Sequence, residues 1–301
     1  MDPLDELRAL VLGAVGVGGV RKVRVLDDIT LTTVDEPLPP RSAMTGPSFA
    51  VVAQGVKRTT LNGIHHDYHA GQYLVVPLDL PVTGQALVAS PDAPLVVLSM
   101  TLNTHAIAPL LLETGVPAKT STPTGLATSD ASPELLDPVV RLLRVLDRPD
   151  DLRVLAPGYR REILWRLLTG EQGPLVRQIG TTDGHLGHIA RAIRWLRENY
   201  AAPVSVAELA KVAGMSESTF HRHFRSATSM TPIEYRQQIR LQRARVLLAA
   251  GTTSVAEAGY LVGYESASQF NREYRRAFGV SPGAHRSAVP TASSGSGHRP
   301  R

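Results

Sequence analysis

The sequence predicts an α+β protein of two domains, with a β-rich N-terminal half and an all-helical C-terminal half. Three observations support this fold class. The length of 301 residues fits about two domains of 100–200 residues each. Short runs rich in Val and Leu, separated by turn residues, fill positions 23–103 and indicate strands. Helical periodicity begins near position 133 and continues into the C-terminal half.

The apolar runs in the first half predict the strands of a β-sandwich or small barrel. Asn62-Gly63 lies between two strand-like segments and predicts a tight hairpin turn. A short helix at residues 4–12 is expected to precede the strands. The expected strands cover residues 22–31, 48–54, 72–76, 85–89 and 94–102.

Two helices and a linker are predicted after the strands. The helix at 133–146 has a continuous Leu/Val face, which either packs on the β-rich domain or forms a dimerisation surface. A second helix is predicted at 158–169. Residues 171–184 are rich in Gly and Thr and are expected to be an interdomain linker. The Ser/Gly/Pro-rich tail at 288–301 is expected to be disordered.

The positive charge of the chain lies entirely in the C-terminal part. Residues 1–180 carry 16 Lys+Arg and 19 Asp+Glu, a net charge of −3, whereas residues 181–301 carry 16 and 8, a net charge of +8. This asymmetry predicts a polyanionic partner for the C-terminal part alone. Arg accounts for 28 of the 32 basic residues. Arg binds phosphate and guanine bidentately, although a genome rich in Arg codons would give the same ratio.

Composition and motifs exclude several classes of protein. Cysteine is absent, which excludes disulfide scaffolds, thiolate metal sites and cysteine nucleophiles. The sequence has no nucleophile–base pair, phosphate-binding glycine loop or paired acidic motif, so no catalytic residue and no cofactor is predicted. The apolar run at 11–20 is too short to span a bilayer and follows acidic residues. We therefore expect a cytoplasmic protein without a membrane partner.

An internal repeat dominates the basic half. Residues 205–224 (SVAELAKVAGMSESTFHRHF) match residues 254–274 (SVAEAGYLVGYESASQFNREY) at an offset of 49, which becomes 50 after one inserted residue. Each unit opens with the Ser-x-x-Glu spacing of a capping box, which begins a helix. The helix ends at a glycine and a second helix follows at once. This is the helix-turn-helix pattern, whose second helix enters the major groove of DNA.

Helical phase selects the side chains that face outward from each second helix. With Phe220 and Phe270 turned to the core, the outward faces centre on Arg222 and Arg272. We expect these two arginines to dominate base recognition. The predicted DNA-contacting residues are Ser216, Ser218, Thr219, His221, Arg222, Arg225, Arg240, Ser266, Ala267, Ser268, Gln269, Arg272, Arg275 and Arg276.

Some of these assignments leave alternatives open. Gln269 either reads adenine or closes a capping box with Ser266. Arg240, Arg243 and Arg245, on the connecting helix at 232–250, are expected to contact phosphates or form salt bridges. That helix would be about 28 Å long at 1.5 Å per residue. Since one DNA turn is about 34 Å, one chain could read two successive major grooves.

The C-terminal ~100 residues resemble the DNA-binding domain of the AraC/XylS transcriptional regulators. The resemblance implies a seven-helix domain over residues 185–287, with base contacts from Ser218, His221, Arg222, Ala267, Ser268, Gln269 and Arg272. The chain departs from the family pattern at Gly259, where alanine is usual, and at His285, where an aromatic residue is usual. The motifs are Ala207-Glu-Leu-Ala210, Gly214-Met-Ser216, Phe220-His-Arg222, Pro232-Ile-Glu-Tyr235-Arg236, Val262-Gly-Tyr264-Glu-Ser266 and Phe270-Asn-Arg-Glu-Tyr274.

The N-terminal half resembles the cupin-like sensor domain of one subgroup of this family, through Tyr68-His-Ala-Gly71-Gln-Tyr73 and Arg160-Arg-Glu-Ile-Leu-Trp-Arg-Leu-Leu-Thr-Gly170. The resemblance implies a cupin-like β-barrel with flanking helices over residues 1–170, which binds a small effector or mediates dimerisation. The candidate effector-binding residues are Gln54, His66, Tyr68 and Tyr73. The cluster of His65, His66 and His69 lacks the His-x-His spacing of metal-dependent cupins, so no metal is predicted.

The expected function is sequence-specific DNA binding by a transcriptional regulator that responds to a small-molecule effector. The expected partners are double-stranded promoter DNA and the effector, with RNA polymerase and a second copy of the chain as further candidates. Two alternatives stay open. One is a metal-dependent cupin enzyme fused to a DNA-binding domain, and the other is a constitutive DNA-binding protein whose N-terminal half only dimerises.

Overall fold

The structure is a computed structural model that describes residues 1–115, 125–181 and 184–287. The predicted disordered tail at 288–301 lies outside the described residues. The chain forms two compact units. The first contains Met1–Trp195 and Ser205–Tyr235, and the second contains Leu196–Val204 and the chain from Arg236 onward.

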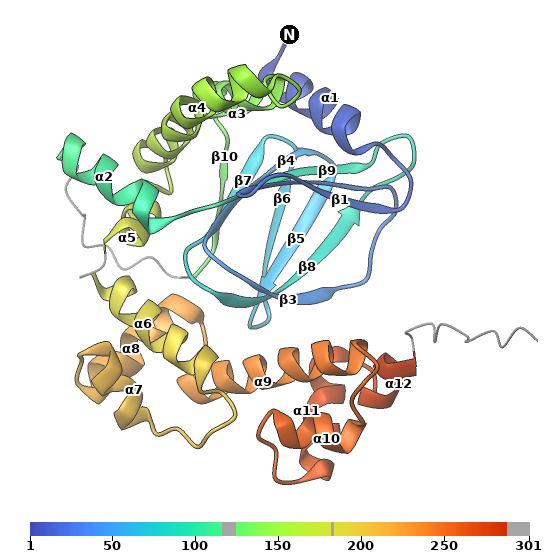
Figure 1. The fold of residues 1–301 in the computed structure, drawn as a ribbon, viewed down its shortest axis with the longest axis vertical. Coiled ribbons are helices and arrows are strands. Elements are labelled where there is room, and N and C mark those ends of the chain that lie inside the picture. The colour runs from blue at the N-terminus through green and yellow to red at the C-terminus, as the bar shows by residue number, and fades with distance from the viewer. Residues whose placement is uncertain (116–124, 182–183, 288–301) are drawn as a thin grey trace, which may run out of the picture. The chain divides into compact units, whose positions relative to one another are not determined.

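Two antiparallel sheets form the centre of the first unit (Figure 1). One sheet has the order β1-β2-β9-β4-β7-β10 and the other has the order β3-β8-β5-β6. Neither sheet closes on itself, so the expected cupin-like barrel is not confirmed. The predicted α+β class is confirmed, because a β-rich N-terminal half precedes a helical C-terminal half. The strands are β1 (Val20–Leu26), β2 (Ile29–Val34), β3 (Arg41–Thr45), β4 (Ser48–Gln54), β5 (Val56–Leu61), β6 (Ile64–His69), β7 (Gln72–Val76), β8 (Leu80–Val88), β9 (Leu95–Thr101) and β10 (Ala127–Asp130).

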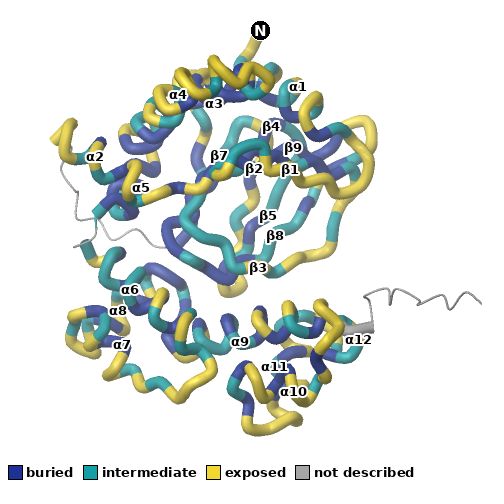
Figure 2. The backbone as a smooth tube through the Cα atoms, in the orientation of Figure 1, coloured by how far each residue is buried: buried dark blue, intermediate teal, exposed yellow. Residues whose placement is uncertain are grey.

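The centre of the six-stranded sheet is buried on both faces, whereas most of the edge strand β1 is exposed. The run Phe49–Ala53 of β4 is buried throughout, and β4 lies between β9 and β7. A strand covered on both faces has a continuous apolar sequence instead of an alternating one, which explains why β4 is apolar at successive positions. Figure 2 shows this buried centre of the sheet in dark blue.

Three helices cover the outer face of the six-stranded sheet (Figure 1): α1 (Pro3–Val15), α3 (Pro133–Arg144) and α4 (Pro149–Thr169). In α1, Leu7 and Val11 lie one turn apart and are fully buried. The apolar face of α3 packs against α1 and α4, and Leu136, Val139 and Leu143 are at most 4% exposed. This burial favours packing within the chain over the alternative of a dimerisation surface.

The observed elements differ from the expected ones in several places. The strand expected at 22–31 is two strands, β1 and β2, which pair around a turn at Asp27. The helix expected at 158–169 begins nine residues earlier, at Pro149. Within the segment expected to be a linker, Gly173–Gly180 forms helix α5, which packs on α4 and on α2 (Thr104–Thr114).

The C-terminal half is entirely helical within the described residues, and none of the helices described there or in the N-terminal half is long and apolar enough to cross a membrane. Residues 185–287 form seven helices, as the resemblance implied. These are α6 (His185–Glu198), α7 (Val206–Ala213), α8 (Glu217–Thr228), α9 (Pro232–Ala249), α10 (Val255–Leu261), α11 (Ala267–Phe278) and α12 (Pro282–Ser287). Helix α9 starts in the first unit and continues into the second.

Candidate functional site

Both repeats form the predicted helix–turn–helix. Ser205 and Glu208 form a complete capping box at the start of α7, and Ser254 and Glu257 form one at the start of α10. In the first repeat Gly214 ends the helix in the left-handed conformation, at φ +67°. In the second repeat the turn glycine, Gly263, has φ +90°. The glycines fit because residues with a Cβ are strained at positive φ.

The predicted helical phase of α8 and α11 is confirmed. Phe220 and Phe224 are fully buried in α8, as are Phe270 and Tyr274 in α11. Arg222 and Arg272, on the opposite faces, are exposed, and the structure describes no residue that forms an ion pair with either. Arg58, Arg141, Arg144 and Arg160 of the β-rich half, in contrast, all pair with carboxylates.

All but one of the remaining predicted DNA contacts lie on α8 and α11 or at the N-caps of these helices, and the exception is Arg240. Thr219 is partly buried, and its hydroxyl accepts a hydrogen bond from that of Ser216 at 3.0 Å. Arg240 lies on α9 and is also partly buried. The other members of the set are exposed: Ser216, Ser218, His221, Arg225, Ser266, Ala267, Ser268, Gln269, Arg275 and Arg276.

Arg240 has a structural partner set in the second unit. Its Nε donates to the carbonyl of Tyr200 at 2.8 Å, and its Nη2 donates to the carbonyl of Ala201 at 2.9 Å. The guanidinium also lies 5.8 Å from the ring centroid of Tyr264, within reach of a cation–π interaction. Burial lowers the pKa of Arg240 from its ordinary value. These contacts hold the segment that precedes α7 against α9.

Arg243 and Arg245 also pack on aromatic rings. The guanidinium of Arg243 lies 5.8 Å from the ring centroid of Tyr200, and that of Arg245 lies 5.2 Å from that of Phe278. Both contacts are within the second unit. The arginines of α9 are thus engaged in packing of this unit.

The two positions that depart from the family pattern have packing explanations. A Cβ on Gly259 would lie 3.0 Å from the ring of Phe270, so the larger ring occupies the space that an alanine would need. At the other position, Nδ1 of His285 lies 2.8 Å from the hydroxyl oxygen of Tyr274. The His285 ring also makes edge contacts with Tyr274 and Phe278. The imidazole therefore takes the place of the aromatic ring.

A second candidate site is a cavity of about 550 Å³ between the two sheets of the first unit. Its volume lies within the range of about 300–1,000 Å³ that is typical of small-molecule sites. Leu74, Val76 and Val97 contribute apolar wall. The polar part includes Thr59 and Tyr68, whose hydroxyl oxygens are 3.3 Å apart and almost fully buried.

Three cations also line this cavity: Lys22, Arg41 and Lys57. No Asp or Glu of the described residues is among the lining residues. Lys57 is partly buried, pairs in register with Tyr68, and has its Nζ 5.8 Å from the centroid of the Tyr68 ring. The next residue, Arg58, is not among the lining residues, and its Nε and Nη2 bind the carboxylate of Asp67 at 2.6 and 2.7 Å.

The four predicted effector-binding residues are not brought together. Tyr68 lines the cavity, whereas Gln54, His66 and Tyr73 do not. The Nε2 of Gln54 donates to the carbonyl of Pro94 at 2.9 Å. His66 pairs with Thr59, and burial lowers its pKa. Tyr73 packs on Phe49, and burial raises its pKa.

Lys57 and Thr59, which the sequence reasoning did not select, line the cavity because they alternate with outward residues along β5. The three histidines of the cluster do not point to one common site. His66 and His69 face opposite sides of β6, because they are three residues apart along one regular strand. Among the residues that the structure describes, no group of three His, Cys, Asp or Glu could hold a metal ion. The alternative of a metal-dependent enzyme therefore gains no support.

Two contacts connect the β-rich part of the first unit to its helix-turn-helix. Asn62, at the tip of the β5–β6 hairpin, donates from Nδ2 to the carbonyl of Ser229 at 2.6 Å. Ser229 is the residue that ends α8. The hydroxyl of Tyr235, near the start of α9, donates to the carbonyl of Asp79. Asn62 and Gly63 both have positive φ, so the predicted hairpin turn is confirmed.

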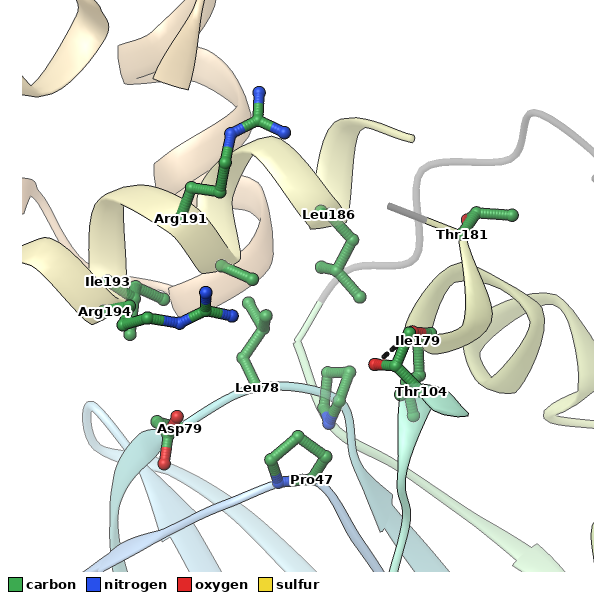
Figure 3. A pocket seen from close by; sticks show the side chains of 13 residues that line it. Pro47, Leu78, Asp79, Thr104, Ile179, Thr181, Leu186, Arg191, Ile193 and Arg194 are labelled. Atoms are coloured by element: carbon green, nitrogen blue, oxygen red, sulfur yellow. Dashed lines mark hydrogen bonds between the residues drawn. The ribbon is translucent and has the colours of Figure 1, made fainter. Parts of the chain in front are cut away.

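A smaller pocket of about 290 Å³ lies beside these contacts, between α6 and the loops at the ends of the strands (Figure 3). Pro47 lines both this pocket and the larger cavity. Leu78, Leu186 and Ile193 line this pocket, and the Thr104 hydroxyl donates to the Ile179 carbonyl at 3.0 Å, as Figure 3 shows. The pocket thus lies between the loops of the two sheets and α6, the helix that precedes the first helix-turn-helix.

Comparison with known proteins adds two family matches and several relatives. Residues 25–175 match a model described as the AraC-type transcriptional regulator N-terminus, and residues 209–288 match a helix-turn-helix domain. The HTH-type transcriptional activator RhaS of Escherichia fergusonii is 31% identical over 149 residues, covering 49% of this chain and 52% of that protein. The thermoregulatory protein LcrF of Yersinia pestis is 30% identical over 180 residues, covering 59% and 65%. The matched part thus spans between half and two thirds of these relatives.

Solved structures of ToxT from Vibrio cholerae share the fold. One matches with a TM-score of 0.55 at 9% identity, covering 88% of this chain and all of that chain. Another, whose title describes it as bound to an unsaturated fatty acid, matches with a TM-score of 0.54 at 8% identity over 89% and 98%. The paired helix-turn-helix units, the β-rich half that precedes them and the matches to both halves lead to one conclusion: this chain belongs to the family of AraC-type transcriptional regulators.

Proposed function

We propose that this protein is a DNA-binding transcriptional regulator controlled by a small anionic effector in the cavity between the two sheets. In this proposal residues 1–170 form a cupin-like sensing domain, joined through residues 171–184 to a DNA-binding domain at 185–287. The predicted contacts of α8 and α11 read promoter DNA in successive major grooves. RNA polymerase and a second copy of the chain are its further candidate partners, and the cytoplasm is its proposed location.

The observation that carries the proposal is the charge of the cavity wall. Lys22, Arg41 and Lys57 line it without an acidic residue among its described lining residues, and no described residue forms an ion pair with any of the three. A cleft lined by one sign of charge, with walls of low dielectric constant, concentrates ligands of opposite charge. Elsewhere in the same unit, arginines such as Arg58 and Arg160 pair with carboxylates. We therefore expect the ligand to supply the missing anion.

The rest of the wall defines the kind of anion. Leu74, Val76 and Val97 favour an apolar body, while Lys57 with the hydroxyls of Thr59 and Tyr68 can hold a carboxylate. The fatty acid named in the ToxT title combines these two properties, and this similarity in fold supports the same class of ligand here. An amphipathic carboxylate thus fits the wall better than a sugar or a free metal ion.

The β5–β6 hairpin connects this ligand to DNA reading. Lys57, Thr59 and Tyr68 lie on the two strands of the hairpin, and Asn62 at its tip holds the carbonyl of Ser229 at the end of α8. A ligand that shifts the hairpin would change the position of α8. If the hairpin has two positions, the ligand changes their populations by binding to one position with higher affinity than to the other.

Effector binding is tested by thermal unfolding of the full chain with matched pairs of anions and amides, for example octanoate with octanamide and phenylacetate with phenylacetamide. A carboxylate at 100 times its Kd stabilises the folded state by about 2.7 kcal/mol, which corresponds to roughly 5–10 °C for a domain of this size. We expect a shift with the anion and none with its amide. Lys57→Gln should abolish the shift, while Lys211→Gln, an exposed lysine on α7, should keep it.

Equal shifts with acid and amide, or a normal response from Lys57→Gln, would contradict an anionic effector. The hairpin connection has its own test. Asn62→Gly keeps a turn of positive φ but removes the side chain that reaches Ser229. This variant should still show the thermal shift, yet the effector should no longer alter its DNA affinity in a fluorescence anisotropy titration. If the effector changes the DNA affinity of Asn62→Gly as much as it changes that of the wild type, this connection is contradicted.

A further inference from the structure

Three side chains of the second unit form a hydrogen-bonded group at the start of α11. The hydroxyl of Tyr264 donates to Oε2 of Glu273 at 2.7 Å, and Nε2 of Gln269 donates to Oε1 of the same carboxylate at 3.0 Å. Gln269 and Glu273 are four residues apart and therefore share one face of the helix. Both oxygens of Glu273 are engaged, one toward the core and one toward the exposed face.

The core side of this group is firmly held. The Tyr264 side chain is buried, and its ring packs on Phe270 with centroids 5.2 Å apart. Its other neighbour is the guanidinium of Arg240, which is fixed by the carbonyls of Tyr200 and Ala201. Burial would raise the pKa of Glu273, but hydrogen bonds from Tyr264, Gln269 and Gln237 on α9, together with the charge of Arg276, outweigh it and hold this pKa below its usual value. The carboxylate is thus charged and pointed at Gln269.

The charge of Glu273 determines which end of the Gln269 amide faces outward. A carboxylate only accepts hydrogen bonds, so it must face the amide nitrogen of Gln269 and repels the amide oxygen. The nitrogen has two hydrogens, of which Glu273 takes one. The outward face therefore presents Oε1 as an acceptor and one remaining N–H as a donor. This is the pair of groups with which Gln binds N6 and N7 of adenine in the major groove.

The Gln269 side chain does not close the capping box considered for it with Ser266. Ser266 caps α11 by accepting a bond from the backbone N–H of Gln269 at 3.3 Å. The side chain of Gln269 reaches forward to Glu273 instead of back to Ser266. It is exposed on the helix that carries Arg272. The amide is thus available for a base edge.

We propose that Glu273, anchored by Tyr264, is a positioning residue that fixes the Gln269 amide so that α11 selects adenine at one base pair. This inference rests on the proposed function, because it requires α11 to read bases. Fixing the amide before binding removes a conformational cost from the complex and prevents the flipped amide, which would match other base edges. Neither Glu273 nor Tyr264 needs to touch DNA for this effect.

The experiment is a binding selection from a random 30-base-pair duplex library, with the full-length protein and sequencing of the bound DNA. Gln269→Ala identifies the base pair that Gln269 reads. We expect adenine there for the wild type, and a preference reduced about 5- to 10-fold in Glu273→Ala and in Tyr264→Phe. Preferences at base pairs read by Arg272 should not change. Glu273→Ala combined with Gln269→Ala should have no further effect at that base pair.

Glu265→Ala is the matched control. Glu265 is an exposed carboxylate close to the start of α11, and the bonds of Tyr264 and Gln269 go to Glu273 instead. This variant should keep the adenine preference, which separates positioning from a general change in charge. A preference in Glu273→Ala as strong as in Glu265→Ala overturns the proposal. So does a base other than adenine at the Gln269 position, or no position affected by Gln269→Ala. A wild-type protein that selects no motif at all would instead refute the proposed function itself.

Discussion

The turn of the second helix-turn-helix allows a quantitative prediction for Gly263→Ala. Gly263 has φ +90°, and a Cβ there would lie 2.4 Å from the carbonyl oxygen of Ala201 and 2.6 Å from Nη2 of Arg240. Positive φ costs a residue with a Cβ about 1–2 kcal/mol. The Cβ must also displace the hydrogen bond between Arg240 and Ala201, and bonds to charged groups contribute about 1.5–3 kcal/mol. Because this site is partly exposed, the hydrogen bond contributes less than the upper end of its range. We therefore expect Gly263→Ala to lower the free energy of unfolding by about 3–4 kcal/mol in total.

Gly251→Ala is the matched control in the same unit. Gly251 has φ +76°, and no atom lies within 4 Å of a Cβ built there. This variant carries the backbone strain without the collision, so it should cost about 1–2 kcal/mol. The difference of about 2 kcal/mol isolates the contact with Ala201 and Arg240. It corresponds to about a 30-fold change in a local opening equilibrium, at 1.4 kcal/mol per factor of ten.

Native-state hydrogen exchange followed by mass spectrometry measures this difference locally. Peptides from α10 and α11 should exchange about 30-fold faster in Gly263→Ala than in Gly251→Ala, while peptides from α7 and α8 should be unchanged. Equal protection of α10 and α11 in both variants would refute the reasoning. It would show that the segment at 200–202 moves away at little cost.

Further predictions concern DNA binding, pH and capping. Arg272→Ala should weaken binding to a selected duplex by about 1–3 kcal/mol, which an anisotropy titration at fixed salt would detect; unchanged affinity would refute this role. Bonds from the backbone and side chain of Ser205 lower the pKa of Glu208 from its usual 4.5, so its contribution to stability is present above pH 4.5 and is lost as pH falls through the lower folded value. Urea midpoints measured from pH 7 to pH 3 should therefore fall less in Glu208→Gln than in the wild type, and parallel curves would contradict this. Ser254→Ala should reduce stability by about 1 kcal/mol through loss of a helix cap, and an unchanged urea midpoint would show that the cap contributes nothing.

The helical half was predictable because its signals are local. The capping boxes, the turn glycines and the aromatic pairs Phe220/Phe224 and Phe270/Tyr274 each lie within a few residues of the structure that they specify. Side-chain phase around a helix follows from the same spacing. The exposure of Arg222 and Arg272 could therefore be predicted without knowledge of the rest of the fold.

The β-rich half was less predictable because strand pairing depends on distant residues. The sequence VKRTTL of β5 has no clear alternation of apolar and polar residues, so the inward position of Lys57 only becomes visible once β5 lies between β8 and β6. Helix α4 was expected to start after Pro157. The helix continues through this proline, because packing on α3 compensates for the lost backbone hydrogen bond.

The second helix-turn-helix is a repeat in sequence but not a continuous segment in space. Arg236 and Arg240 of α9 hold the carbonyls of residues 200–202, which precede the first repeat. A fragment that begins at α9 would leave these guanidiniums without their acceptors. The second repeat therefore depends on a segment of chain that lies on the far side of the first repeat in the sequence. To transfer the DNA specificity of the second helix-turn-helix between relatives, one should therefore exchange the surface residues of α11. A transplanted segment that begins at α9 would lose the carbonyl acceptors at residues 200–202.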